Sequence, residues 1–150
     1  MSLQPFLKDE LIKVHVNCEN QDQVFELIYK EALERGYVKE EYLKKVKERE
    51  AIFPTGLNMN SHNVAIPHTD PEYVHEQFIA VATLDNPVPF YLMDDNTKQV
   101  DVNVVFMLGL NEPHSQLTVL QQIMGVIQDG SKIEEILKAS KGEEIRAIFA

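Results

Sequence analysis

The sequence predicts a single α/β domain in which helices flank a mixed central sheet. Some segments carry the apolar spacing of helices, and others alternate or run continuously apolar as strands do. These segments are interspersed along the chain, with no internal repeat, low-complexity segment or flexible linker between them. With 150 residues, of which 44% are hydrophobic, the chain is long enough to bury one core. We therefore expect one domain over residues 1–150.

The first half of the chain predicts one strand, two helices and a loop. Residues 10–16 alternate apolar and polar positions, which is typical of a strand with one buried face. Helical spacing extends from Gln21 to about Arg35, where Gly36 follows as a stop signal. A second helix is expected over residues 39–51, and the turn-forming residues of segment 53–63 predict a loop. The side chains expected to face inward from these helices are Val24, Leu27, Ile28, Ala32, Tyr42, Leu43 and Val46.

The second half predicts two buried strands followed by helices. Residues 77–85 form a near-continuous apolar run, as in a strand buried on both faces, and Asn86 with Pro87 is expected to end it. Residues 100–110 alternate and then become wholly apolar, which predicts a central strand. A helix is expected over residues 114–128, with an inward stripe of Leu117, Leu120, Met124 and Ile127. Two short helices are expected to close the domain, over residues 131–139 and 143–149.

Charge and cysteine content exclude several classes of protein. The formal net charge at pH 7 is −10, whereas nucleic acids and anionic membranes bind basic surfaces. No segment is long and apolar enough to cross a bilayer, and the N-terminal residues are too polar and acidic for a signal peptide. The single cysteine, Cys18, suits a reducing cytosol. We therefore expect a cytoplasmic domain whose acidic surface suits a protein partner with a basic face.

The segment Asn63–Asp70, NVAIPHTD, places a histidine where a strand should end. Pro67 has no amide hydrogen and a fixed φ, so it stops strand pairing and biases Ile66 toward an extended conformation. His68 is then held on a stiff stem at the edge of the sheet. A neutral imidazole there has a lone pair that suits nucleophilic attack, proton transfer or metal binding. An ordinary exposed loop histidine is the alternative interpretation.

Three further residues indicate an anion site when they are taken with His68. His114 lies in the predicted first turn of its helix and on the inward stripe, where free amide groups favour anions. Arg49 falls on the inward face at the end of its helix, where an arginine either extends to solvent or pairs with an anion. Thr55 offers a hydroxyl in the turn that follows. Each residue also has an ordinary structural interpretation, but together they suit a site where an imidazole attacks phosphorus. No Walker loop is present, so a nucleotide is not expected as the phosphate source.

These motifs resemble those of a known family. NVAIPHTD is similar to the active-site signature of the IIA domains of the bacterial sugar phosphotransferase system (PTS), in the fructose–mannitol class. REAIFPTGL, FIAVATLDNPVPF, VNVVFMLGL and EPHSQLTVLQQIM occur in the family's order and approximate spacing, so the resemblance covers nearly the whole chain. The segments FPTGL, AIPHTD and PHSQL, with Thr69 where other branches often have glycine, most resemble galactitol-type IIA proteins.

The resemblance implies a phosphocarrier, a phosphotransferase of the sugar PTS. His68 matches the histidine that takes a phosphoryl group from the carrier protein HPr and passes it to a cysteine of the cognate IIB, which feeds the membrane component IIC. His114 matches a second histidine that hydrogen-bonds the phosphoryl group, and Arg49 matches an arginine that stabilises its charge. Thr55 corresponds roughly to a hydroxyl donor. The family fold, the phosphotransferase/anion transport protein fold, is a single α/β domain with a mixed sheet, and no metal or organic cofactor is implied.

Three other functions remain open on the sequence. A regulatory IIA paralogue would use the same phosphohistidine for signalling. A pure binding module would leave all five histidines incidental. A metal-binding hydrolase would need ligands from His62, His68, His75 and Asp70, although their spacings do not present ligands from one helical face.

A docking surface is expected around His68, because exposed apolar residues beside a histidine suit transient protein contact. The residues expected to form the rim of this surface are Phe53, Leu57 and Met59.

Overall fold

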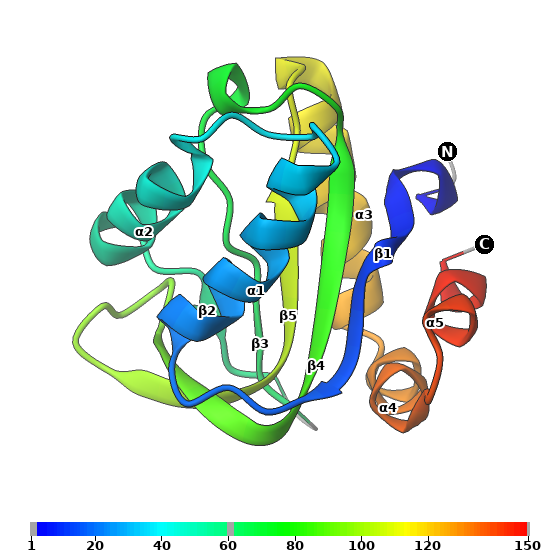
Figure 1. The fold of residues 1–150 in the computed structure, drawn as a ribbon. Helices are drawn as coiled ribbons and strands as arrows, with labels where there is room; N and C mark the ends of the chain where they lie inside the picture. Colours follow the sequence, from blue (N-terminus) through cyan, green and yellow to red (C-terminus); the bar gives the residue numbers. More distant parts are fainter. Residues whose placement is uncertain (1–2, 60–61, 150) are drawn as a thin grey trace.

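The computed structural model describes residues 3–59 and 62–149, and it is built on one five-stranded sheet (Figure 1). The order of the strands across the sheet is β1-β4-β5-β3-β2. β1 runs parallel to β4 and β3 runs parallel to β5, whereas the β4–β5 and β2–β3 pairs are antiparallel. The mixed sheet expected from the sequence is therefore confirmed. The strands are β1 (Leu7–Val16), β2 (Gly56–Leu57), β3 (Val64–Ala65), β4 (Phe78–Tyr91) and β5 (Gln99–Gly109).

Helices cover both faces of this sheet (Figure 1). On one face lie α1 (Gln21–Glu34) and α2 (Tyr42–Ile52), and on the other lie α3 (Pro113–Ile127), α4 (Gly130–Lys138) and α5 (Gly142–Ile148). Two single-turn 3-10 helices are also found among the described residues: η1 (Gln4–Phe6) directly precedes β1, and η2 (Pro71–Tyr73) lies in the connection between β3 and β4. Among the described residues, none of the helices combines the length and the apolar character that a membrane crossing requires.

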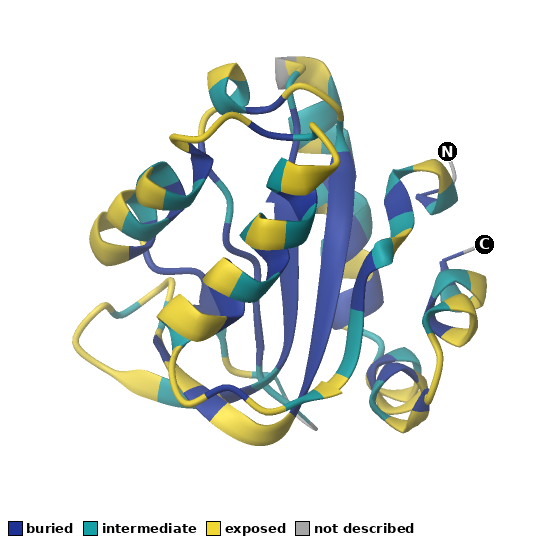
Figure 2. Cartoon of the chain, viewed as in Figure 1, coloured by how far each residue is buried: buried dark blue, intermediate teal, exposed yellow. Residues whose placement is uncertain are grey.

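β4 has buried side chains on both of its faces, because the sheet carries a core on each side. Ile79 and Val81 pack in the core beneath α3, α4 and α5, whereas Phe78 and Ala80 pack in the core beneath α1 and α2. Figure 2 shows the middle of the sheet as buried and the outer surfaces of the helices as mostly exposed. The continuous apolar run in the sequence follows from this two-sided burial.

α1 and α2 confirm the two helices expected in the first half of the chain. The side chain of Asn20 accepts a hydrogen bond of 2.9 Å from the Gln23 amide and so caps the start of α1. Gly36, with a φ of 75°, follows the end of α1 in the left-handed conformation that favours glycine. α2 begins at Tyr42, later than residue 39, and Leu43 is only partly buried.

β4 continues through Asn86 and Pro87, so the expectation that these residues end the strand is wrong. Its pairing with β5 passes from Thr83 opposite Val104 to Val88 opposite Val102, with a register shift between them. A bulge of this kind takes residues out of the ladder without ending the strand. Pro87 lies within the shift, where its missing amide hydrogen leaves no ladder bond unmade.

The inward stripe of α3 differs from the stripe expected. Leu117 is 63% exposed, while Leu120 and Met124 pack against the core without being fully buried and Ile127 is buried. The buried positions that the sequence pattern did not select are Val119, Ile123 and Val126. α3 is apolar on much of its circumference, so periodicity alone allowed two overlapping stripes, and the helix packs on the one that leaves Leu117 outside.

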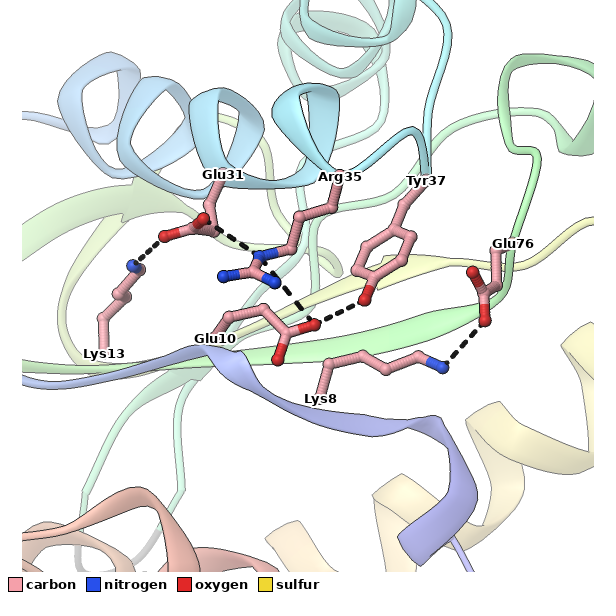
Figure 3. Close-up of polar contacts among 7 residues, drawn as sticks. All are labelled: Lys8, Glu10, Lys13, Glu31, Arg35, Tyr37 and Glu76. Atoms are coloured by element: carbon pink, nitrogen blue, oxygen red, sulfur yellow. Dashed lines mark hydrogen bonds and ion pairs between the residues drawn. The ribbon is translucent and has the colours of Figure 1, made fainter.

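β1 forms one edge of the sheet, and charged side chains cover it (Figure 3). Lys8 pairs with Glu76 at 3.1 Å and Lys13 pairs with Glu31 at 3.1 Å, which ties the edge to neighbouring segments. Glu10 accepts a hydrogen bond from the Tyr37 hydroxyl, which lowers the pKa of Glu10 and raises that of Tyr37 to about 12. Such charges protect an edge strand from pairing with another chain.

Gly109, the last residue of β5, gives a direct test of this packing. A Cβ atom at residue 109 would overlap the ring of Phe78, which is fully buried. We therefore expect Gly109→Ala to lower the free energy of unfolding by ~1–3 kcal/mol in urea denaturation. Gly125, on the exposed side of α3, has open space where an added Cβ atom would lie, so the control Gly125→Ala should raise stability by up to ~1 kcal/mol. Equal stabilities of the two variants would contradict the packing described.

Candidate functional site

His68 lies just beyond β3, at the end of the sheet where β3 and β5 stop. Its stem is fixed by Pro67, whose carbonyl oxygen accepts a hydrogen bond of 2.9 Å from the Leu108 amide of β5. Nδ1 of His68 lies 2.8 Å from the carbonyl oxygen of Ile66. Because a carbonyl only accepts hydrogen bonds, Nδ1 carries the hydrogen in the neutral ring and the lone pair is on Nε2.

The surroundings of His68 keep its ring neutral. Burial lowers the pKa of His68, because desolvation penalises the charged imidazolium, and the nearby Arg49 guanidinium acts in the same direction. The hydrogen bond with Ile66 and the Asp70 carboxylate oppose this shift, but the net change in pKa is downward. Nε2 is therefore unprotonated at neutral pH and able to act as a nucleophile.

Arg49, in the last turn of α2, brings a cation to the same site. Its Nη1 lies 3.9 Å from Oδ1 of Asp70, a loose ion pair, and its guanidinium carbon lies 5.4 Å from the centre of the Phe53 ring. Arg49 Nε is buried without a hydrogen-bond partner, a condition shared in the described part of the chain only by Arg146 Nε. A buried donor without an acceptor is costly, so Arg49 is suited to receive an anion.

His114 follows the end of β5, as His68 follows the end of β3. β3 and β5 are neighbouring parallel strands, so the two histidines come from the carboxyl ends of adjacent strands, where α/β sheets bind ligands. Figure 1 shows the first turn of α3 and the segment leading into η2 at this same end of the sheet. His114 itself is exposed, which differs from the inward position expected from the sequence. The cause is the rotation of α3 that also exposes Leu117.

Thr55 is buried and its hydrogen-bonding groups are already engaged. Its amide and its hydroxyl each donate a hydrogen bond of 2.8 Å to the carboxylate of Glu50, which is itself 4% exposed. Burial raises the pKa of Glu50, and these two bonds act against that shift. The sequence predicts that Thr55 donates a hydrogen bond to a phosphoryl group. In the structure its single hydroxyl proton is donated to Glu50 instead. The pair instead closes the turn behind Arg49.

A metal-binding hydrolase requires a cluster of ligand side chains, and the described residues do not contain one. Within residues 3–59 and 62–149, no group of three or more His, Cys, Asp and Glu side chains lies close enough to hold a metal ion. His68 and Asp70 serve the site described above, and His62 and His75 do not join them in a ligand set.

Exposed apolar side chains adjoin the site on the side of α2. Phe53 is 61% exposed and Ile52 is 64% exposed, and both line an open depression that also contains Arg49 and Asp70. Of the rim expected from the sequence, Phe53 is thus exposed. Leu57 and Met59 are partly buried and pack against the core beneath α3, so they contribute less to the surface.

Three residues in or next to the site have contacts that the sequence alone does not predict. Glu50 follows Arg49 directly, and an acidic residue just before a Pro-Thr-Gly turn was a signal that it holds the turn. Asp70 acts on His68 as a nearby charge and not as the metal ligand that the hydrolase alternative requires, and its place two residues after His68 is the signal for that charge. Tyr42 is buried, as its inward position in the helical pattern predicts, but that pattern does not reveal that its hydroxyl donates to the carbonyl of Leu108, next to the stem of His68.

Comparison with known proteins identifies a family, relatives and solved structures that this chain resembles. The family model for the phosphoenolpyruvate-dependent sugar phosphotransferase system, EIIA 2, matches residues 5–150. The galactitol-specific EIIA component of Escherichia coli strain K12 is 28% identical over 126 residues, which cover 84% of this chain and 83% of that protein. The mannitol-specific IIA component of Geobacillus stearothermophilus is 29% identical over 148 residues, covering 97% and 95%. The fold also matches the E. coli complex of IIA mannitol with phosphorylated IIB mannitol, with a TM-score of 0.75, 21% identity and coverage of 95% and 96%.

The mixed sheet, with a neutral histidine and a buried guanidinium nitrogen without a partner at one end, suits a phosphoryl-transfer protein of the α/β class. With the family model matching nearly its whole length, the chain belongs to the EIIA type 2 family of the phosphoenolpyruvate-dependent sugar PTS. It is a phosphocarrier component of such a system, and its activity is phosphoryl transfer.

The pKa of His68 provides a test of the site that does not depend on a partner. Followed by NMR through the ring C–H resonances, His68 should titrate below the ordinary pKa of histidine. Arg49→Gln should raise this pKa, because it removes a cation that disfavours imidazolium, and Asp70→Asn should lower it, because it removes a carboxylate that favours imidazolium. Arg35→Gln serves as the control: Arg35 follows the last residue of α1, where it pairs with Glu31 at 3.1 Å, and its loss should leave the titration of His68 unchanged. Titration of His68 above the ordinary value would contradict the site.

Proposed function

We propose that His68 accepts a phosphoryl group on Nε2 from HPr and passes it to a cysteine of a IIB partner, which in turn feeds the membrane component IIC. One observation carries the proposal: Nε2 holds the free lone pair, since Nδ1 is committed to Ile66, and the neighbouring Arg49 has a buried donor without a partner. A nucleophile and a cationic acceptor site are thus supplied together, as phosphoryl transfer requires.

The transfer step follows from the tautomer of His68. The Nε2 lone pair forms the bond to phosphorus as the bond from phosphorus to the donor imidazole nitrogen of HPr breaks. The hydrogen on Nδ1 stays hydrogen-bonded to the Ile66 carbonyl throughout, so the phosphorylated ring keeps its orientation. In the next step a thiolate of IIB attacks phosphorus, the Nε2–phosphorus bond breaks, and the electron pair returns to Nε2.

Arg49 and His114 act on the charge of the transferred group. Arg49 offers its unpaired Nε and a guanidinium that Asp70 holds only loosely, so it can stabilise the phosphoryl oxygens. His114, exposed on the first turn of α3, donates a hydrogen bond to the same oxygens. Thr55 contributes indirectly, by holding Glu50 and with it the end of α2.

The similarity to galactitol-specific relatives, together with the galactitol-like segments around His68, supports a galactitol-type system. IIB is supported as the acceptor by the fold match to a IIA protein that was solved in complex with phosphorylated IIB. HPr as donor is supported by the acidic net charge of −10, which suits a partner with a basic face.

Intact-mass measurement after incubation with Enzyme I, HPr and phosphoenolpyruvate tests the proposal. One acid-labile phosphoryl group should be added to the wild-type chain, and none to His68→Ala. His62→Ala and His75→Ala are matched controls that remove a histidine outside the site, and both should still be phosphorylated. Addition that survives the loss of His68 would overturn the assignment, as would a wild-type chain that gains no mass.

The supporting residues should affect the rate of transfer more than the fold. Loss of one charge-stabilising donor reduces rates by about 10²–10³-fold in other sites, so Arg49→Ala should slow single-turnover transfer from phospho-HPr by that order. Arg49→Lys keeps the charge but loses the guanidinium fork and should recover only part of the rate. His114→Ala should slow transfer by about tenfold, as expected for the loss of one hydrogen bond to a charged group. If both variants with alanine transferred at the wild-type rate, the proposed roles would be wrong.

A further inference from the structure

The hydroxyl of Tyr42 makes a buried hydrogen bond next to the stem of His68. Tyr42 is the first residue of α2 and is fully buried, with its ring edge-on to Phe78 at a centroid distance of 6.1 Å. Its hydroxyl donates a hydrogen bond of 2.6 Å to the carbonyl oxygen of Leu108. Burial raises the pKa of Tyr42, so the hydroxyl keeps its proton and acts as a permanent donor.

This hydrogen bond stands where the β3–β5 ladder would otherwise continue. In a parallel ladder, one residue donates its amide to the preceding residue of its partner and accepts from the following one. The register of β3 against β5 places residue 68 opposite residue 108, and the Leu108 amide does donate to Pro67. One further step would bring the Thr69 amide to the Leu108 carbonyl. The Tyr42 hydroxyl occupies that carbonyl instead, at the position where the chain leaves the sheet.

The same contact fixes the helix that carries Arg49. Arg49 follows Tyr42 by seven residues, about two helical turns, so the two side chains project from the same side of α2. A single residue, Leu108, therefore holds both parts: its amide bonds the strand end that precedes His68, and its carbonyl bonds the start of α2. The placement of Arg49 relative to His68 depends on this junction.

We propose that Tyr42 is a positioning residue for phosphoryl transfer: its hydroxyl ends the β3–β5 ladder at Leu108 and thereby sets where His68 leaves the sheet relative to Arg49. The inference rests on the proposed role of His68. Without the hydroxyl, the Leu108 carbonyl is free to recruit the Thr69 amide, which would extend the ladder and turn the His68 ring away from its position beside Arg49.

Tyr42→Phe removes this one hydroxyl and keeps the ring against Phe78. In single-turnover transfer from phospho-HPr, the maximal rate should fall by about 10- to 100-fold, the effect of misplacing a reacting group by a small distance. The concentration of phospho-HPr at half-maximal rate should not change, because Tyr42 is buried away from any docking surface. Tyr29→Phe is the matched control: its hydroxyl also donates to a backbone carbonyl, that of Glu40, at 2.9 Å, and its rate should equal that of the wild type.

A stability loss is separated from a positioning effect by measuring both variants in the Gly125→Ala background, which stabilises the fold away from the site. The slowed transfer of Tyr42→Phe should persist there, even where the melting temperature is restored. A second readout needs no transfer: the NMR titration of His68 should shift in Tyr42→Phe and stay unchanged in Tyr29→Phe.

Three outcomes would overturn the proposal: a wild-type rate in Tyr42→Phe, recovery of its rate in the stabilised background, or an unchanged titration of His68. A wild-type chain that is never phosphorylated would refute the proposed function instead, and the His68 titration would still decide whether Tyr42 positions the ring.

Discussion

Two hydrogen bonds on one residue, Leu108, hold the functional end of this molecule together. The Leu108 amide donates to Pro67, which precedes His68, and the Leu108 carbonyl accepts from Tyr42, which begins α2. The first bond belongs to the sheet and the second to the packing of a helix on it. His68 and the helix that carries Arg49 are thereby anchored to the same residue of β5, the central strand of a sheet that is buried on both faces. A site built on buried strands and helices is held more rigidly than one built on loops alone.

A carrier must hold a phosphoryl group without binding it too tightly to pass it on. The charges around His68 meet both needs. Arg49 supplies positive charge and lowers the pKa of His68, whereas Asp70 draws on the same guanidinium and acts on that pKa in the opposite direction. The ring therefore stays neutral and nucleophilic, while the cation available to the phosphoryl group is moderated by an exposed carboxylate. A stronger set of buried cations would stabilise the phosphorylated state and slow its onward transfer.

Periodicity in the sequence predicts much of the fold. The parts that it does not predict have one physical cause in common, which is tertiary packing. The apolar run of residues 77–85 is a strong local signal, and β4 confirms the buried strand that it predicts. The stop of strand pairing expected at Pro67 is only partial, because the Pro67 carbonyl still accepts a hydrogen bond from the Leu108 amide of β5. Local propensity predicts a strand end at Asn86 and Pro87, because it does not reveal the bulge opposite β5. The rotation of α3, which exposes Leu117 and His114, depends on which of two apolar stripes fits the sheet, and only packing decides that. For the site, residue type and spacing select His68 and Arg49 as candidates, but partners of buried groups, such as Glu50 for Thr55, are set by tertiary structure.

The proposed transfer depends most on which nitrogen of His68 reacts, and one measurement on the phosphorylated protein identifies that nitrogen. With ¹⁵N-labelled histidine, the one-bond coupling between ³¹P and ¹⁵N identifies the phosphorylated nitrogen, and the Nδ1 proton is visible in the same sample. The structure predicts phosphorus on Nε2 and a hydrogen retained on Nδ1, bonded to Ile66. Phosphorus on Nδ1 would require the hydrogen bond with Ile66 to break and would contradict the account.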